Sequence, residues 1–186
     1  MYDGFAYISK YGILKKDDYT PYTHRTGKCA ITESALRNQK HIDSIGYVEH
    51  DGRTNYELKE LLQNQPISIA IHTTGMFSGY RFGVLTEKYL RCSNPSYEVN
   101  HGVLLVGYGK VDRESMADRV SSGSCSEYWI VRNSWGSSWG DDGFFKLCAD
   151  GLGSDDAPYG TCLINKYATW PTFDLNDINP DDEPTE

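Results

Sequence analysis

Two apolar segments, each adjacent to one polar residue of catalytic type, constrain the possible fold of this chain more than any other feature. The first, residues 100–109, carries His101 at the head of its apolar run. The second, residues 128–145, carries Asn133 two residues after the apolar run 129–131. Short runs rich in Val, Ile, Trp and Tyr and bounded by Gly are typical of buried strands. If the two strands pair, His101 and Asn133 meet, which suits a base held by an orienting amide.

These segments resemble the histidine and asparagine regions of papain-like cysteine proteases, the cathepsin-like peptidase C1 family. The run Asn-Ser-Trp-Gly-Ser-Ser-Trp-Gly at 133–140 is strongly specific, whereas a lone Asn-His-Gly would be weak evidence. The resemblance extends over roughly residues 1–170, through the stretches 11–13, 19–22 and Cys29, then 65–70 and 79–85. It implies an α+β, papain-like fold: an antiparallel β-barrel lobe with peripheral helices and a remnant of the helical lobe.

The resemblance also implies three parts of the chain. Residues 1–30 would be the remnant of the helical lobe with the interdomain stretch, and residues 31–172 the β-barrel lobe. Residues 173–186 would form an acidic tail, which we expect to be disordered rather than a docking peptide. This tail holds six acidic residues and no basic one, and without them the net charge of −8 would be −2. Most of the negative charge therefore comes from the tail. The acidic balance argues weakly against nucleic-acid binding.

Local patterns predict several elements around the two segments. Residues 2–11 are expected to form a short helix. A second helix is expected over 54–64, where Thr54 and Glu57 have the spacing of a capping box. A strand over 67–71 then follows a proline. No apolar run approaches the ~20 residues that span a bilayer, and the first residues do not resemble a signal peptide.

By resemblance, His101 would be the catalytic base, although a lone histidine beside an apolar strand is usually structural. A cysteine thiolate needs a nearby cation, which imidazolium supplies, to depress its pKa from about 8.5. The same proton would later pass to the leaving amine. Asn133 would accept from the other ring nitrogen and fix the tautomer. Trp135 would cover that hydrogen bond, and Trp139 would either line the primed side or serve as a core aromatic.

The resemblance also points to an S2 substrate pocket formed by Ala70, Val99, Gly102 and Tyr167. These residues would make an apolar wall with a bulky base, which favours a medium apolar side chain at P2. We find no phosphate-binding Gly loop and no zinc-spaced Cys/His cluster in the sequence, and we expect neither cofactor nor metal. The expected partner is a peptide or protein substrate.

None of the five cysteines, at 29, 92, 125, 148 and 162, lies in the family's Cys-Gly-Ser-Cys-Trp context. By alignment, Met1 falls after that motif, so the chain is expected to be a C-terminal portion without the nucleophile's segment. Cys92 and Cys162 occupy positions that pair in the family, and Cys162 is expected to start a closing strand that runs to Trp170. Cys125 could pair with Cys148, and Cys29 would be unpaired or bonded to a chain upstream.

Three functions remain open at this point. In the first, the chain is the larger part of an active cysteine peptidase whose nucleophile comes from a separate N-terminal piece, and it is inactive alone. In the second, it is a catalytically dead module with a structural or binding role in an assembly that covers the barrel. In the third, the least favoured, Cys125 is a relocated nucleophile.

Two further features of the sequence concern its cellular compartment and one long loop. Cysteine content and resemblance indicate a lysosomal, vacuolar or secreted protein, although a cytosolic protein with reduced thiols is the alternative. The polar segment 110–127 is longer than the family usually carries there, and such loops either bind something or are mobile.

Overall fold

The computed structural model describes residues 1–14, 19–29, 31, 46–51, 54–94, 96–151 and 157–172, the backbone alone for 46–51. The chain divides into two units, Met1–Val48 with Pro171–Glu186, and Glu49–Trp170. The second unit contains every predicted site residue. The predicted limits at residues 30 and 172 stay predictions, and the acidic tail lies outside the described residues.

In the first unit, the predicted N-terminal helix is present as α1, Tyr2–Tyr11. Asp3 in its first turn and Lys10 in its last complement the helix dipole. Gly12 ends the helix with φ 74°, a conformation that glycine adopts without steric cost, and its amide donates to the carbonyl of Ile8 at 2.8 Å. A local sequence signal, Gly12, therefore sets the C-terminal end of this helix.

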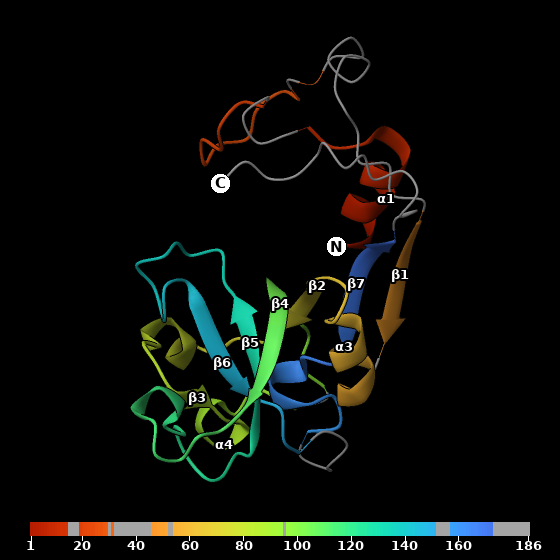
Figure 1. The fold of residues 1–186 in the computed structure, drawn as a ribbon. Helices are drawn as coiled ribbons and strands as arrows, with labels where there is room; N and C mark the ends of the chain where they lie inside the picture. Colours follow the sequence, from red (N-terminus) through yellow and green to blue (C-terminus); the bar gives the residue numbers. More distant parts are fainter. Residues whose placement is uncertain are drawn as a thin grey trace. The chain divides into compact units, whose positions relative to one another are not determined.

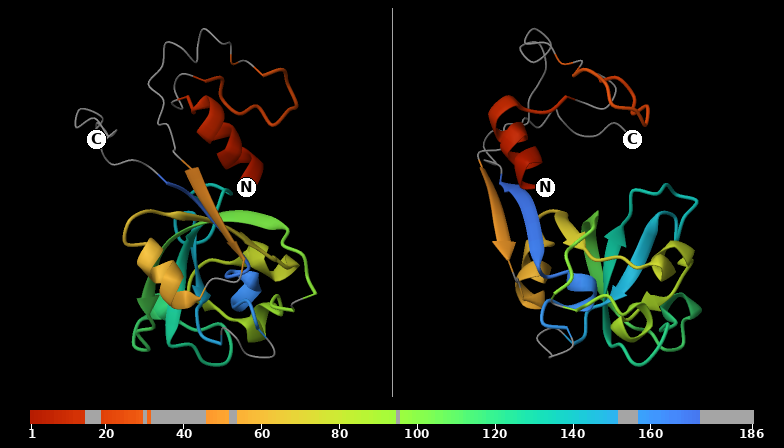
Figure 2. Two further views of the ribbon diagram at one scale, coloured as in Figure 1. Left: turned by 90° about the vertical axis from the view of Figure 1, so that its right-hand side faces the viewer. Right: turned by 180° about the vertical axis from the view of Figure 1, so that it is seen from behind.

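Seven strands form a mixed sheet in the order β1-β7-β2-β4-β5-β6-β3. Their bounds are β1 Gly46–Asp51, β2 Ile67–Ile71, β3 Val84–Leu85, β4 His101–Lys110, β5 Glu127–Arg132, β6 Phe144–Cys148 and β7 Tyr167–Thr172. β7, β2, β4, β5 and β6 are successively antiparallel, whereas β3 pairs with β6 in parallel. Figure 1 shows β4, β5 and β6 side by side, and Figure 2 follows the same strands from the side and from behind.

The α+β organisation agrees with the sequence prediction, but the sheet is not closed into a barrel. Among the described residues, β1 and β3 stand at its two ends and do not pair with each other. The far side of β3 is taken by the chain between β4 and β5, because the amide of Val84 donates to the carbonyl of Arg119 at 2.9 Å. An edge that already has a partner cannot close onto another strand.

The core lies between the sheet and its covering turns, and alternation along the strands explains it. Ile67, Ile69 and Ile71 of β2 are fully buried, while the residues between them are half-buried. The same alternation buries Trp129 with Val131 in β5. Side chains of a strand point alternately to its two faces, so this pattern fixes which face packs inward.

The predicted capping box is present at the start of α3, Asn55–Leu61. The Thr54 hydroxyl accepts from the Glu57 amide at 3.3 Å, and the Glu57 carboxylate accepts from the Thr54 amide at 2.9 Å. The remaining helices are short: η2 Gly75–Gly79, α4 Glu87–Leu90, η3 Met116–Asp118 and η4 Thr161–Leu163. Among the described residues, no helix has both the length and the apolar character needed to cross a membrane.

The predicted closing strand begins later than expected. Cys162 lies in η4 with φ 55°, and β7 starts only at Tyr167. The turn is held in place because the amide of Cys162 donates to the Ser93 hydroxyl and its carbonyl accepts from the amide of His72, both at 2.9 Å. These contacts come from distant parts of the chain, so the local sequence does not reveal them.

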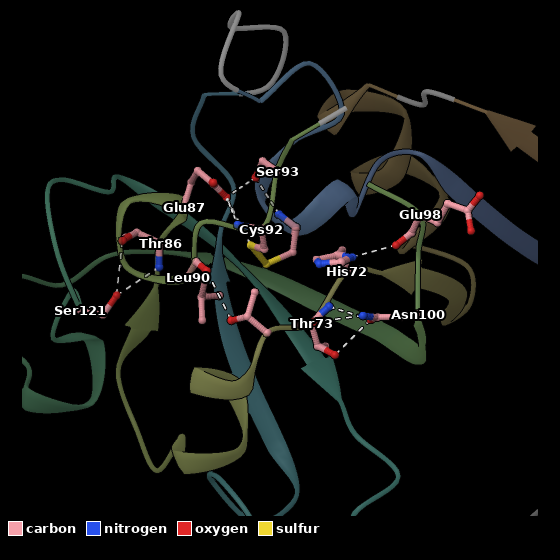
Figure 3. Close-up of a disulfide and its surroundings, with 12 residues drawn as sticks. His72, Thr73, Thr86, Glu87, Leu90, Cys92, Ser93, Glu98, Asn100 and Ser121 are labelled. Atoms are coloured by element: carbon pink, nitrogen blue, oxygen red, sulfur yellow. Dashed lines mark hydrogen bonds between the residues drawn. A yellow bond between two sulfur atoms is a disulfide. The ribbon is translucent and has the colours of Figure 1, made fainter. Parts of the chain in front are cut away.

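Two disulfides tie the second unit together. Cys92 is bonded to Cys162, and Cys125 to Cys148. Figure 3 shows the first with Glu87, whose carboxylate accepts from the Cys92 amide at 3.1 Å and from the Ser93 hydroxyl. Because the sulfur of Cys125 is bonded to Cys148, the hypothesis of a relocated nucleophile at Cys125 is wrong. Cys29 is a free, exposed thiol.

Candidate active site

Strands β4 and β5 bring the imidazole and the amide together. Leu104 of β4 faces Arg132 of β5 in the antiparallel register. His101 lies three residues before Leu104, and Asn133 directly follows Arg132, so both stand at the same end of the strand pair. The amide of Asn133 also donates to the carbonyl of Gly143 at 2.9 Å, which fixes where the chain leaves β5.

The two side chains form a hydrogen bond whose direction can be assigned. Nε2 of His101 lies 2.9 Å from Oδ1 of Asn133. The same oxygen accepts from the backbone amide of Ser134 at 2.8 Å, so it is the acceptor, and Nε2 must carry the proton. Asn133 is only 7 % exposed, which keeps water from competing for this bond. Nδ1 of His101 makes no hydrogen bond within the described part of the chain and is free for a reacting group.

Aromatic rings surround this pair. The Trp135 ring lies 5.2 Å from the His101 ring and is 42 % exposed, while Trp139 meets Trp135 edge-on at 5.0 Å. The indole of Trp139 is held by a 3.0 Å bond from Nε1 to the carbonyl of Ser78. Trp135 is therefore a partly exposed cover over the imidazole, and Trp139 is its lateral support.

Phe77 is a contributor whose place beside the site the sequence did not indicate. It is fully buried in η2, and its ring contacts those of His101, Trp135 and Trp139 at 6.4, 5.8 and 5.4 Å. Its position next to the imidazole depends on how η2 packs across the sheet, and no local pattern encodes that.

Asn100, directly before His101, is a second contributor that sequence reasoning missed. Its Oδ1 accepts from the amide and hydroxyl of Thr73 at 2.8 and 3.1 Å, and its Nδ2 donates to the Thr73 carbonyl at 3.1 Å (Figure 3). Its backbone amide donates to the carbonyl of Ile71 at 3.0 Å. These bonds fasten the start of β4 to the end of β2 and so fix the backbone that carries His101. An Asn beside the histidine is the only signal in the sequence.

Three of the four predicted pocket residues lie next to one another on neighbouring strands. Ala70 of β2 faces Gly102 of β4 on one side and Tyr167 of β7 on the other. Directly opposed residues of antiparallel strands share a face of the sheet, so these three form a row. Val99 lies outside the row, in the segment that precedes β4. Gly102 is exposed, and Ala70, Val99 and Tyr167 are half-buried.

One buried phenol stands beside the aromatic rings. Burial raises the pKa of Tyr80 to about 12, against the opposing effect of the Lys146 amide that donates to its oxygen. Its hydroxyl donates to the carbonyl of Gly83 at 2.8 Å, and its ring lies 5.6 Å from that of Trp139. Tyr80 therefore remains a neutral donor at physiological pH and acts as a support for Trp139.

Within the described residues, one group has spacing suited to a metal: Cys125, Cys148 and Asp150. Both sulfurs belong to one disulfide, so they offer no thiolate for a metal. The Asp150 carboxylate accepts from the amides of Ser126 and Glu127 at 2.7 and 3.1 Å. The group is a structural junction at the ends of β5 and β6.

Comparisons with known proteins point to one family. The family described as "Papain family cysteine protease" matches residues 1–172. "Cysteine protease 1" of Oryza sativa subsp. japonica is 32% identical over 92% of this chain and 30% of its own length. "Thiol protease SEN102" of Hemerocallis is 35% identical over 90% of this chain and 40% of its own length. The chain thus spans well under half of these relatives.

Solved structures show the same fold. Bromelain from Ananas comosus, in complex with the E64 inhibitor, superimposes with a TM-score of 0.68 at 27% identity, covering 91% of this chain and 67% of bromelain. The papain-like fold predicted from the sequence is confirmed. The match over nearly all of the sequence, together with the fold, shows that the chain belongs to the papain family of cysteine proteases.

Proposed function

We propose that this chain carries the base half of a cysteine peptidase active site, with His101 as the base and Asn133 as its orienting partner. The observation that carries the proposal is the 2.9 Å bond from Nε2 of His101 to Oδ1 of Asn133, with Nδ1 left free. This arrangement leaves an unprotonated nitrogen free to accept the proton of a thiol. The reaction class is peptide-bond hydrolysis, as the family membership implies.

The imidazole would act twice in this reaction. It takes the proton of the cysteine thiol, and the resulting ion pair is the reactive form. The thiolate attacks the substrate carbonyl, and His101 gives the proton to the leaving amine as a thioester forms. It then takes a proton from water, which hydrolyses the thioester. Asn133 holds the ring in one tautomer throughout, and Trp135 limits access of water to their bond.

The nucleophile in this proposal comes from a segment outside these 186 residues. Four of the five cysteines are bonded in disulfides, and Cys29 lacks the family's Cys-Gly-Ser-Cys-Trp context. We therefore expect the 186-residue chain to be inactive by itself. A non-catalytic binding module is the alternative, and the experiment below separates the two.

The row formed by Ala70, Gly102 and Tyr167, together with Val99, supports an apolar S2 pocket. None of the four residues carries a charge that could pair with an acidic or basic P2 side chain. Peptide or protein substrates with a medium apolar P2 residue would fit this surface better than charged ones.

The test compares the 186-residue chain with the longer protein encoded when the transcript is read upstream of Met1. The chain alone should neither hydrolyse a fluorogenic dipeptide with leucine at P2 nor gain the mass of a peptidyl epoxide. The longer protein should contain an in-frame Cys-Trp motif, hydrolyse the dipeptide, and lose activity when His101 is changed to Ala. Turnover by the chain alone would sink the proposal. A longer protein without the motif and without turnover favours the binding module.

The disulfides support a vacuolar, lysosomal or secreted location, because such bonds persist in oxidising compartments. Among the five cysteines of this chain, alkylation of the native protein in freshly lysed cells should modify Cys29 alone. Modification of four further thiols would place the protein in a reducing compartment instead.

A further inference from the structure

The segment between β4 and β5, residues 111–126, forms an ordered platform at the end of β4 opposite His101 (Figure 1). Its sequence left two alternatives, a binding loop or a mobile one. The structure shows it attached at several points. The backbone of Val84 in β3 donates to Arg119 and accepts from Ser121, both at 2.9 Å, and Cys125 is bonded to Cys148. A segment fastened in this way can present a preformed surface.

An ion pair anchors the middle of the platform. Nζ of Lys146 donates to Oδ1 of Asp118 at 2.6 Å and to the carbonyl of Ala117 at 3.2 Å. The Asp118 side chain is only 8% exposed, and its other oxygen accepts from the amide of Asp112 at 2.9 Å. The charge of Asp118 is therefore neutralised internally and is not offered to a ligand.

Two adjoining hollows open over this platform. The larger, of about 500 Å³, has Val120 and Cys125 in its lining, together with Met116. The smaller, of about 310 Å³, is lined by Phe82 and Tyr89. Both hollows share Arg119 and Val120, so these two residues lie where the hollows meet.

The side chains around the hollows have the composition of a protein-binding surface. Met116 is 64% exposed and Phe82 57%, which leaves apolar area in water at both hollows. Arg113 and Arg119 are exposed and form no ion pair within the described residues, and Glu114 is the acidic lining residue left without a lysine partner. Aromatic residues, Met and Arg are enriched at protein interfaces. The unpaired charge around the hollows is net positive.

We propose that these two hollows form a second binding site, which takes an extended segment of a partner protein rich in acidic and apolar residues. Apolar side chains of the segment would occupy the hollows and bury Met116 and Phe82. A carboxylate between them would pair with the guanidinium of Arg119. The site lies at the end of β4 away from the imidazole, so it would recruit a protein substrate or inhibitor independently of the reaction centre.

The chain itself offers a competing occupant. Residues 173–178 read Phe-Asp-Leu-Asn-Asp-Ile, in which acidic and apolar residues alternate closely, and further acids follow. A synthetic peptide of residues 173–186 therefore belongs in the experiment as a separate arm.

The experiment measures binding of a fluorescein-labelled nonapeptide, Gly-Phe-Glu-Glu-Leu-Glu-Glu-Phe-Gly, to the full chain by fluorescence polarisation. Arg119→Gln should weaken binding about tenfold, because an ion-paired hydrogen bond is lost. The matched control Lys110→Gln removes an exposed charge of the same sign, outside both hollows, and should change the affinity less than twofold. Arg119 serves β3 through its main chain, so the variant should keep the melting temperature of the parent.

Three outcomes would overturn the proposal. In the first, the parent and Arg119→Gln bind the peptide equally. In the second, a peptide with glutamine in place of glutamate binds as tightly. In the third, the peptide of residues 173–186 binds tighter and is the one that depends on Arg119, which assigns the hollows to the chain's own tail. Binding needs no nucleophile, so the result is independent of the catalytic proposal.

Discussion

At the scale of single residues, the bond between His101 and Asn133 combines a fixed tautomer with shelter from water. The oxygen of Asn133 accepts two hydrogen bonds, and its second donor, the Ser134 amide, keeps the side chain from rotating. The imidazole is thus held by Asn133 in an orientation that the backbone amide of Ser134 fixes.

Asn133→Ala in the longer, active protein should lower kcat by roughly 10²-fold, because the ring loses its orientation for proton transfer. KM should change little, since Asn133 does not belong to the predicted S2 pocket. Asn133→Asp is the matched variant that keeps an acceptor and should retain more activity than Ala. Steady-state kinetics on the dipeptide substrate check this, and an unchanged kcat in the Ala variant would contradict it.

The ion pair between the buried Asp118 and the half-buried Lys146 predicts a dependence of stability on pH. Burial works to raise the pKa of Asp118, but hydrogen bonds from Lys146 and from the Asp112 amide outweigh it and leave this pKa below its ordinary value of 3.8. The carboxylate therefore stabilises the fold above about pH 4, and this contribution is lost as pH falls through the lower folded pKa.

Asp118→Asn should lower the free energy of unfolding by about 2 kcal/mol at pH 7, because Lys146 loses its charged partner. The difference between parent and variant should shrink as pH falls from 4 toward 2. Urea unfolding at several pH values measures it. A constant difference over that range would show that the cost is steric and not electrostatic.

At the scale of elements, the features that could be predicted from the sequence are those held by residues close together in the chain. The cap of α3 could be predicted because Thr54 and Glu57 are three residues apart and satisfy each other. The start of β7 could not, because Cys162 is held in a turn by Ser93 and His72, which are remote in sequence. The pairing of β3 with Arg119 and Ser121 was hidden for the same reason.

Only part of the candidate site could be predicted from the sequence. Asn133 stood out through the specific run at 133–140, and His101 through the weaker Asn-His-Gly taken together with that run. The roles of Phe77 and Asn100 did not stand out. Phe77 looks like any core aromatic, and Asn100 like any loop residue, until the fold places them against the imidazole and the end of β2.

Thr54→Ala should destabilise the second unit by about 1 kcal/mol, because the amide of Glu57 loses its acceptor at the helix start. Thr54→Ser keeps the hydroxyl and should cost only a few tenths of that. Chemical denaturation of the three proteins makes the comparison. Equal losses in the Ala and Ser variants would mean that the threonine methyl group, and not the cap, is responsible.

At the scale of the whole molecule, the two disulfides should contribute unequally to the free energy of unfolding. Cys92 and Cys162 are separated by 70 residues, and Cys125 and Cys148 by 23. Closing the longer loop removes more entropy from the unfolded chain, about 4 kcal/mol against about 3 kcal/mol.

Replacing both cysteines of a pair by serine, one pair at a time, tests this order by thermal or chemical unfolding. Loss of the 92–162 bond should cost more than loss of the 125–148 bond. The reverse order would show that the shorter link contributes through the attachment of the platform to β6, in addition to loop closure.

The pairing of β3 with the platform has a consequence for encounters between molecules. An unpaired outer strand exposes a row of amides and carbonyls that can template addition of a strand from another chain. Here the amide and the carbonyl of Val84 are already bonded to Arg119 and Ser121, and the amide of Thr86 to the hydroxyl of Ser121. Residues 111–126 thus cover this edge of the sheet, and shortening them would expose it and raise the tendency to aggregate.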